Sequence, residues 1–239
     1  MPTSEQTPLT IKAFQQHIHD RYYDTDNARG TFEYDEWLQK FSEHGANMTQ
    51  FDLCEGEQLE WTANPSELAY SGEWRGLGYY NQSVAWRLDH VIDAAEARGV
   101  YFRLTLFHWE DFDKEEESFP HWGWQRNPYC TCNGGVVEDV TGFFSDELAR
   151  THVKNFLRYV VARWGYSTNL MAYELFNEVD AADIYWGTGL HYADVTPAVV
   201  DWHSVMAGYL KELDQQGHMV TTSFAHSYNG QEVWSRDGI

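Results

Sequence analysis

The chain has 239 residues, of which 43% are apolar and 16% aromatic, enough material for the core of one large domain spanning 1–239. Its 37 acidic residues against 16 basic ones give a formal net charge of −21, which disfavours nucleic acid and anionic membranes as partners because both bind clusters of Lys and Arg. The longest apolar runs are far shorter than the roughly 20 residues that cross a bilayer. No signal peptide is visible, so an extracellular and a cytoplasmic location both stay open.

Taken in chain order, the sequence first offers a short apolar run, "LTIKAF" at 9–14, which predicts a strand. One unit then repeats four times: an amphipathic helix, a glycine, and an apolar strand. The glycines are Gly45, Gly99, Gly165 and Gly217. Because Gly adopts the left-handed conformation at little cost, each is predicted to end its helix in that conformation.

Two of the helices are recognised by apolar residues at spacings of three and four. The helix before Gly99 has Val84, Leu88, Val91, Ile92 and Ala95, and the helix before Gly165 has Leu148, Val153, Phe156, Leu157, Val160 and Val161. These apolar stripes are predicted to pack on a sheet.

The strands are apolar almost throughout, as in sheets covered on both faces, and their alternation with helices predicts a parallel α/β sheet. Long segments follow the strands at 54–80, 109–143 and 179–195, whereas the links before them are short. In such folds function gathers at the carboxyl ends of strands. The absence of a Gly-rich phosphate loop after any strand, together with the acidic charge, argues against a nucleotide- or phosphate-using enzyme.

Three cysteines, Cys54, Cys130 and Cys132, are too few for a framework of disulfides. The Cys-Thr-Cys spacing differs from that of the common zinc knuckles. We therefore expect free or loop-bound thiols, and no metal or cofactor.

Three predicted strands end in polar or aromatic groups that should meet at one edge of the sheet. His108 and Trp109 follow one strand, Asn177 and Glu178 follow another, and Trp61, Trp122 and Trp124 lie in the loops. Aromatic faces beside carboxylates suit the apolar face and the hydroxyls of a sugar. Each group has a plainer explanation: the tryptophans as core or loop anchors, His108 as a structural histidine, and the Asn-Glu pair as the cap of a turn.

Several stretches resemble, in order, the second to fifth strand regions of the large clan of (β/α)8-barrel glycoside hydrolases. The stretches are "GANMTQFDL", "GVYFRLTLFHW", "NPY" with "NGG", "YVVARWGYSTNLMAYELFNEVD" and "HMVTTSF". The resemblance covers about 30–239 and is closest to cellulase- and mannanase-like members of family 5. It implies an α/β fold, a (β/α)8 TIM barrel of which about the first five βα units are present.

The resemblance also implies a function, the retaining hydrolysis of a β-linked glucan or mannan, with an oligo- or polysaccharide as partner. In that role Glu178 is the general acid/base and Asn177 holds the 2-hydroxyl of the sugar. His108 and Trp109 would line the sugar site, and His226 and Tyr228 are weaker candidates for the same groove.

One departure from the clan is Gln50, which stands where many members carry an arginine near the nucleophile. Inside their strands, Arg103 and Glu174 are predicted instead to form a buried ion pair.

The clan's nucleophile, a glutamate at the end of the seventh strand, has no counterpart in 1–239, so we expect a second carboxylate from outside this sequence. Glu110 or Asp111 is an alternative second carboxylate. The expected barrel has an open edge, which favours a complementary C-terminal segment or an oligomer. A catalytically inactive, carbohydrate-binding remnant is the other function that stays open.

Overall fold

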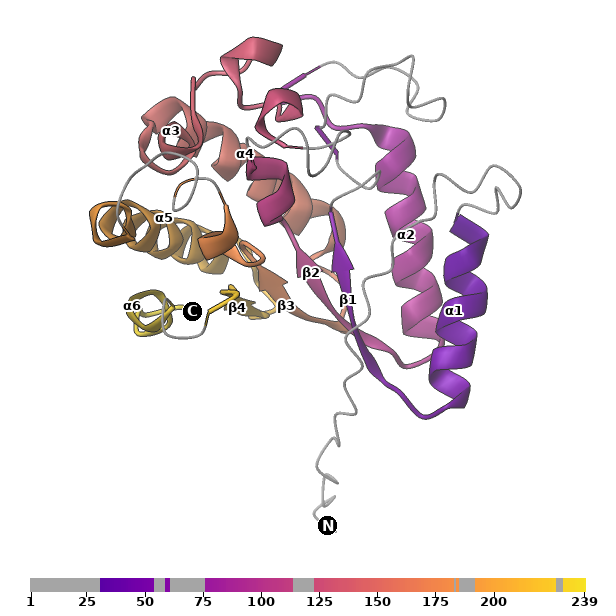
Figure 1. The fold of residues 1–239 in the computed structure, drawn as a ribbon. Helices are drawn as coiled ribbons and strands as arrows, with labels where there is room; N and C mark the ends of the chain where they lie inside the picture. The colour runs from indigo at the N-terminus through magenta and orange to yellow at the C-terminus, as the bar shows by residue number, and fades with distance from the viewer. Residues whose placement is uncertain are drawn as a thin grey trace.

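The structure is a computed structural model that describes residues 31–53, 59–60, 76–113, 123–182, 184, 192–226 and 230–239. The strand predicted at 9–14 lies outside this part of the chain. In order, the elements are α1 Thr31–Glu43, β1 Met48–Asp52, α2 Gln82–Ala97, β2 Tyr101–Thr105, η1 Trp109–Phe112, η2 Trp124–Arg126, η3 Thr131–Asn133, α3 Val140–Ser145, α4 Glu147–Trp164, β3 Leu170–Glu174, η4 Val179–Ala181, α5 Tyr192–Leu213, β4 Met219–Thr221 and α6 Gln231–Trp234 (Figure 1).

The four strands form one parallel sheet in the order β1-β2-β3-β4, so chain order and spatial order are the same. Each crossover therefore adds the next strand on the same side. A doubly wound sheet reverses its strand order part-way, whereas a (β/α) barrel adds strands in one direction, as here. All four strands that follow the repeated glycines are confirmed. In Figure 1 the strands lie at the centre, with α1 and α2 to one side and α3 and α5 to the other.

The two faces of the sheet differ in chemistry. Parallel pairing sets Phe51, Leu104, Tyr173 and Val220 at one level, and all four are buried. At the next level the pairing sets a polar row, Asp52, Thr105, Glu174 and Thr221. The prediction of strands that are apolar almost throughout is therefore wrong for one face, because alternate side chains of a strand point to opposite faces.

The apolar face packs against the helices. The ring of Phe51 lies 6.2 Å from that of Tyr34 on α1 and 5.2 Å from that of Phe102 on β2. The apolar stripe predicted for α2 is fully buried. In α4 the stripe is confirmed except at Leu148, which is 54% exposed, and Val161 is only partly buried. Ala149 is the buried residue of the first turn, where the Asp146 side chain caps the helix.

The glycines before the strands serve two different purposes. Gly45, Gly99 and Gly217 have positive φ angles of 76°, 64° and 74°, as predicted. Gly165 has φ −65° and ψ −3°, so its predicted left-handed conformation is wrong. A Cβ at Gly165 would lie 2.6 Å from the carbonyl oxygen of Val161 and 3.1 Å from the hydroxyl of Tyr173. The Val161 carbonyl of α4 itself and the Tyr173 hydroxyl on β3 therefore leave little room for a side chain at this position.

No helix in the described part of the chain combines the length and the apolar character that crossing a membrane demands.

Candidate active site

The candidate site lies where β2, β3 and β4 end. Three residues beyond each of β2 and β3, His108 and Asn177 form an isolated parallel bridge, and the backbone N–H of Asn177 donates to the carbonyl of Phe107 at 2.8 Å. The polar groups that follow these two strands are therefore neighbours, as the sequence predicts. We call this edge of the sheet the rim, defined by His108, Asn177, Glu178 and Ser223.

Glu178 has an unusual backbone. Its φ of 49° and ψ of 50° place it in the left-handed region, and within the described residues it is the only non-glycine with a positive φ. Such a conformation costs roughly 1–2 kcal/mol for an L-residue. The turn ends the extended segment after β3, begins η4, and leaves the half-buried Glu178 at the rim. Backbone strain of this kind is common at functional sites.

One hydroxyl holds both residues of the Asn177–Glu178 pair. The Ser223 Oγ atom accepts the Asn177 side-chain amide at 3.2 Å and the Glu178 backbone N–H at 3.0 Å. Ser223 also donates its backbone N–H to the carbonyl of Phe176 at 3.0 Å. The chain after β4 is thereby joined to the chain after β3, and the left-handed turn at Glu178 is stabilised.

A polar network lies on the face of the sheet beneath the rim. The Arg103 Nε atom is 3.1 Å from Oε2 of the fully buried Glu174, which confirms the predicted ion pair. Thr105 donates its hydroxyl to the same Glu174 oxygen at 2.7 Å, and Arg103 also donates to Gln50. Gln50 in turn donates to Asp52 at 2.6 Å.

Two influences act on the pKa of Glu174. Burial raises the pKa, while the charge of Arg103 and the hydroxyls of Thr105 and Ser223 oppose the rise. Ser223 therefore connects the buried network to the Asn177–Glu178 pair above it.

His108 and Trp109 lie at the start of η1. His108 is buried, and its Nδ1 atom is 3.5 Å from a carboxylate oxygen of Glu110. The rings of His108 and Trp109 are 6.1 Å apart at an interplanar angle of 32°, and Trp109 packs partly against the core. Both predicted sugar-site residues are thus at the rim.

A buried carboxylate fixes the segment after β4. Asp180 accepts the backbone N–H groups of Ala225 and His226 at 2.6 and 3.0 Å and lies 3.2 Å from the His226 imidazole. The His226 side chain remains 48% exposed. Asp180 therefore orients His226 beside the rim without itself reaching solvent.

The prediction that Trp124 offers a face to a sugar is wrong. The side chain is 1% exposed, its indole N–H donates to the carbonyl of Glu138 at 3.0 Å, and its ring lies 6.1 Å from that of Phe112. A buried ring cannot stack on a ligand, so Trp124 is an anchor of its loop. Trp61, Trp122 and Tyr228 lie outside the described residues.

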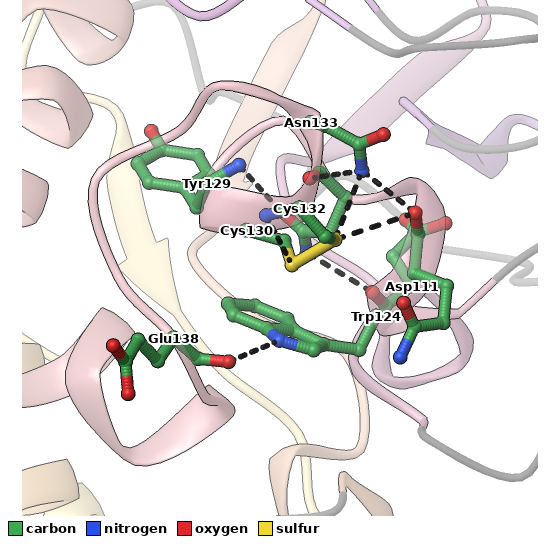
Figure 2. The surroundings of a disulfide bond; sticks show 9 residues. Asp111, Trp124, Tyr129, Cys130, Cys132, Asn133 and Glu138 are labelled. Carbon is green, nitrogen blue, oxygen red and sulfur yellow. Dashed lines mark hydrogen bonds between the residues drawn. A yellow bond between two sulfur atoms is a disulfide. The ribbon is translucent and has the colours of Figure 1, made fainter.

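The expectation of free thiols is also wrong for two of the cysteines. Cys130 and Cys132 form a disulfide (Figure 2), whereas Cys54 lies outside the described residues. Within the part of the chain that the structure describes, no group of three or more His, Cys, Asp or Glu side chains is arranged to hold a metal ion.

Sequence reasoning overlooked Ser223 and Asp180. Both lie in stretches that carry the family resemblance, and the only available signal was their place just after a strand. Their hydrogen bonds join segments about 45 residues apart, which no local pattern encodes.

The comparisons with known proteins agree with this geometry. No family profile matches the chain. Over 213 residues it is 26% identical to mannan endo-1,4-beta-mannosidase 4 of Oryza sativa subsp. japonica, a match that covers 84% of this chain and 39% of the relative. Among solved structures, the endo-1,4-beta-mannanase from Rhizomucor miehei matches with a TM-score of 0.68 at 14% identity, covering 99% of this chain and 67% of that one.

The fold is that of a family 5 barrel. A glycoside hydrolase family 5 mannosidase from Rhizomucor miehei also matches, with a TM-score of 0.60 at 15% identity, covering 96% of this chain and 55% of that one. The resemblance to cellulase- and mannanase-like family 5 enzymes is thus confirmed, on the mannanase side. The match spans between a quarter and about two fifths of the length of the curated relatives.

Proposed function

We propose that this chain carries the acid/base half of a retaining glycoside hydrolase that cleaves β-1,4-linked mannan. The observation that supports the proposal most strongly is the Asn177–Glu178 pair at the end of a barrel strand, with Glu178 in a strained turn held by Ser223. The choice of mannan over glucan rests on the similarity to proteins named as mannan endo-1,4-beta-mannosidases.

In this proposal β3 is the fourth strand of the barrel, counted from the predicted strand at 9–14. The Glu178 carboxyl donates its proton to the glycosidic oxygen as the bond to the anomeric carbon breaks. After a glycosyl-enzyme forms, the Glu178 carboxylate takes a proton from water as the water oxygen attacks that carbon. A positioned acid/base contributes roughly 10²–10⁴-fold to the rate.

Asn177 has the groups to hold the 2-hydroxyl of the sugar. Its amide donates one N–H to Ser223, which fixes the plane of the group, and an amide has a second N–H and a carbonyl oxygen for a ligand. His108 and the half-buried Trp109 supply the neighbouring wall, and His226 the opposite side.

The nucleophile must be a second carboxylate about 5–5.5 Å from the first. Glu174 and Asp180 have other roles, the first in the ion pair with Arg103 and the second in accepting two backbone N–H groups. We propose that the nucleophile is supplied from outside residues 1–239, by a complementary segment or subunit. Glu110, beside His108, and the buried Asp111 are the alternatives within the described residues.

The second candidate function is carbohydrate binding without turnover. It is favoured by the same rim, since His108, Trp109 and Asn177 would bind a sugar whether or not a nucleophile is present.

Hydrolysis of soluble β-mannan and β-glucan, measured together with binding, separates the two functions when the chain is assayed both alone and with the segment or subunit that supplies the nucleophile. Turnover of mannan that is abolished by Glu178→Gln excludes the binding-only function. Binding of mannan without turnover in the completed enzyme, unchanged by Glu178→Gln, excludes the hydrolase function. Turnover that survives Glu178→Gln but is lost in Glu110→Gln overturns the assignment of the acid/base.

A further inference from the structure

The disulfide between Cys130 and Cys132 takes no part in the proposed hydrolysis. It spans a single residue, Thr131, in the segment 123–139, which contains η2 and η3 and ends just before α3. Figure 2 shows it among side chains that hold this segment together.

The segment is held by many bonds besides the disulfide. The Asn133 side-chain amide donates to the carbonyls of Gln125 and Asn127 at 2.7 and 3.1 Å, and the Asn127 amide donates to the carbonyl of Asp111 at 3.0 Å. Backbone bonds join 129–131 to 135–137, and the Trp124 indole binds the carbonyl of Glu138.

A disulfide that closes so short a loop adds little to stability. The loop-closure contribution grows with the number of residues enclosed, and for three residues it is only about 1.5 kcal/mol. Because the hydrogen bonds of 123–139 do not depend on the sulfur–sulfur bond, its opening leaves the segment folded.

The two sulfurs differ in access and in surroundings. Cys130 is 3% exposed, whereas Cys132 is exposed. The backbone N–H of Cys132 donates to the Cys130 sulfur at 3.2 Å, and such a donor stabilises a thiolate. An incoming thiolate therefore reaches Cys132, and Cys130 is the better leaving group.

The reduced form also has partners in place. The Cys132 sulfur lies 3.6 Å from the carbonyl oxygen of Gln125. In the disulfide this sulfur has no hydrogen to donate, but as a thiol it has one, and the acceptor is already there. The side-chain amide of Asn133, also 3.6 Å away, can donate to the same sulfur.

We propose that Cys130–Cys132 is a thiol-exchange site that accepts a low-molecular-weight thiol at Cys132. The thiolate of the small molecule attacks the Cys132 sulfur, a mixed disulfide forms there, and the sulfur–sulfur bond breaks to leave the Cys130 thiolate. A second small thiol then releases Cys132 as a thiol, and the two small thiols leave as their own disulfide.

The test uses the protein with Cys54→Ser, so that only this pair reacts. The folded protein is exposed to glutathione as the probe, quenched with acid, and analysed by thiol titration and by mass mapping of the adduct. Circular dichroism before and after shows whether the fold persists. The expected result is an increase from no free thiol to two, a transient adduct on Cys132, and an unchanged spectrum.

Two further variants test directly whether the Cys130 and Cys132 sulfurs differ in reactivity. Cys130→Ser, in the same background, should be converted by oxidised glutathione to a lasting adduct on Cys132. Cys132→Ser should react about tenfold more slowly, because the remaining sulfur is buried. An adduct on Cys130, or equal reaction rates for the two variants, overturns the proposal. So do two free thiols before any reductant is added, or thiols that are released only after denaturation in urea.

Discussion

At the scale of single residues, Ser223 matters because one hydroxyl oxygen accepts both the Asn177 amide and the Glu178 backbone N–H. The unusual φ of Glu178 persists only if its surroundings favour it, and this hydrogen bond is part of those surroundings. Ser223 is therefore a positioning residue for the proposed acid/base.

Ser223→Ala should loosen the turn at Glu178. A hydrogen bond of this kind contributes about 1 kcal/mol, so hydrogen exchange at the Glu178 amide should be about fivefold faster. In any hydrolysis assay, the Ser223→Ala variant should show a lower kcat rather than a higher KM. Ser204→Ala is the matched control, because that hydroxyl binds a carbonyl within α5, on another element. Equal hydrogen-exchange rates of the Glu178 amide in the two variants would contradict the role of Ser223 as a positioning residue.

Glu174→Gln should destabilise the fold by about 2–3 kcal/mol. The change keeps the shape of the side chain but leaves Arg103, whose side chain is only 23% exposed, without its counter-charge. Removing one partner of a buried ion pair is strongly destabilising. Urea denaturation measures the loss. As a control, Lys40→Gln breaks an exposed pair with Glu36 and should cost less than about 1 kcal/mol. A Glu174→Gln variant as stable as this control would rule out a stabilising ion pair.

At the scale of elements, the repeated helix–glycine–strand unit could be predicted because it depends on local rules. Apolar spacing identified α2 and α4, and three of the four glycines have the predicted positive φ. Gly165 is the exception because its requirement comes from close approach to the Val161 carbonyl and the Tyr173 hydroxyl, and its φ is negative. Leu148 is the other exception, since the N-cap at Asp146 sets the orientation of the first turn.

Gly165→Ala should therefore lower stability, although its backbone angles suit alanine. The added carbon would lie 2.6 Å from the Val161 carbonyl oxygen. Overpacking of this kind lowers the free energy of unfolding by about 1–3 kcal/mol. Gly208→Ala in α5 is the matched control, because nothing lies within 4 Å of its new carbon and the helix should gain about 0.5–1 kcal/mol. Thermal unfolding should shift in opposite directions for the two variants. A shift in the same direction would contradict the packing argument.

At the scale of the whole molecule, the meeting of strand ends could be predicted because parallel strands place their carboxyl ends at one edge. The barrel type was an implication of the family resemblance. The burial of Trp124 and the pairing of Cys130 with Cys132 could not, because an aromatic or a cysteine in a loop has no periodic neighbours to show its environment. Contacts between distant segments, such as Ser223 with Glu178, belong to the same class.

Glu60 should make stability fall with rising pH. Burial raises the pKa of this carboxyl to about 8, although the Gly78 N–H that it accepts at 2.8 Å opposes the rise. Unfolding returns the pKa to about 4.5. The folded state thus binds more protons at Glu60 between those values. The contribution of Glu60 to stability is therefore largest below about pH 4.5 and declines up to about pH 8, by at most about 1.4 kcal/mol per pH unit.

Glu60→Gln removes this decline, because an amide does not titrate and its oxygen can still accept from Gly78. Urea midpoints at a series of pH values measure the effect for the protein and the variant. Parallel curves for the two would show that Glu60 is not the group responsible.

The central claim is that Glu178 is the acid/base of a retaining β-mannosidic hydrolase. Its most direct test is Glu178→Ala in the enzyme completed by the segment or subunit that supplies the nucleophile, with substrates that differ in leaving group. Mannan needs protonation of its leaving oxygen, so its turnover should fall by roughly 10²–10⁴-fold. An aryl β-mannoside with an acidic phenol needs no such proton, so formation of its glycosyl-enzyme should be nearly unchanged. Added azide should then restore turnover and yield the β-mannosyl azide. Equal losses for both substrates, or an α-mannosyl azide, would contradict the claim.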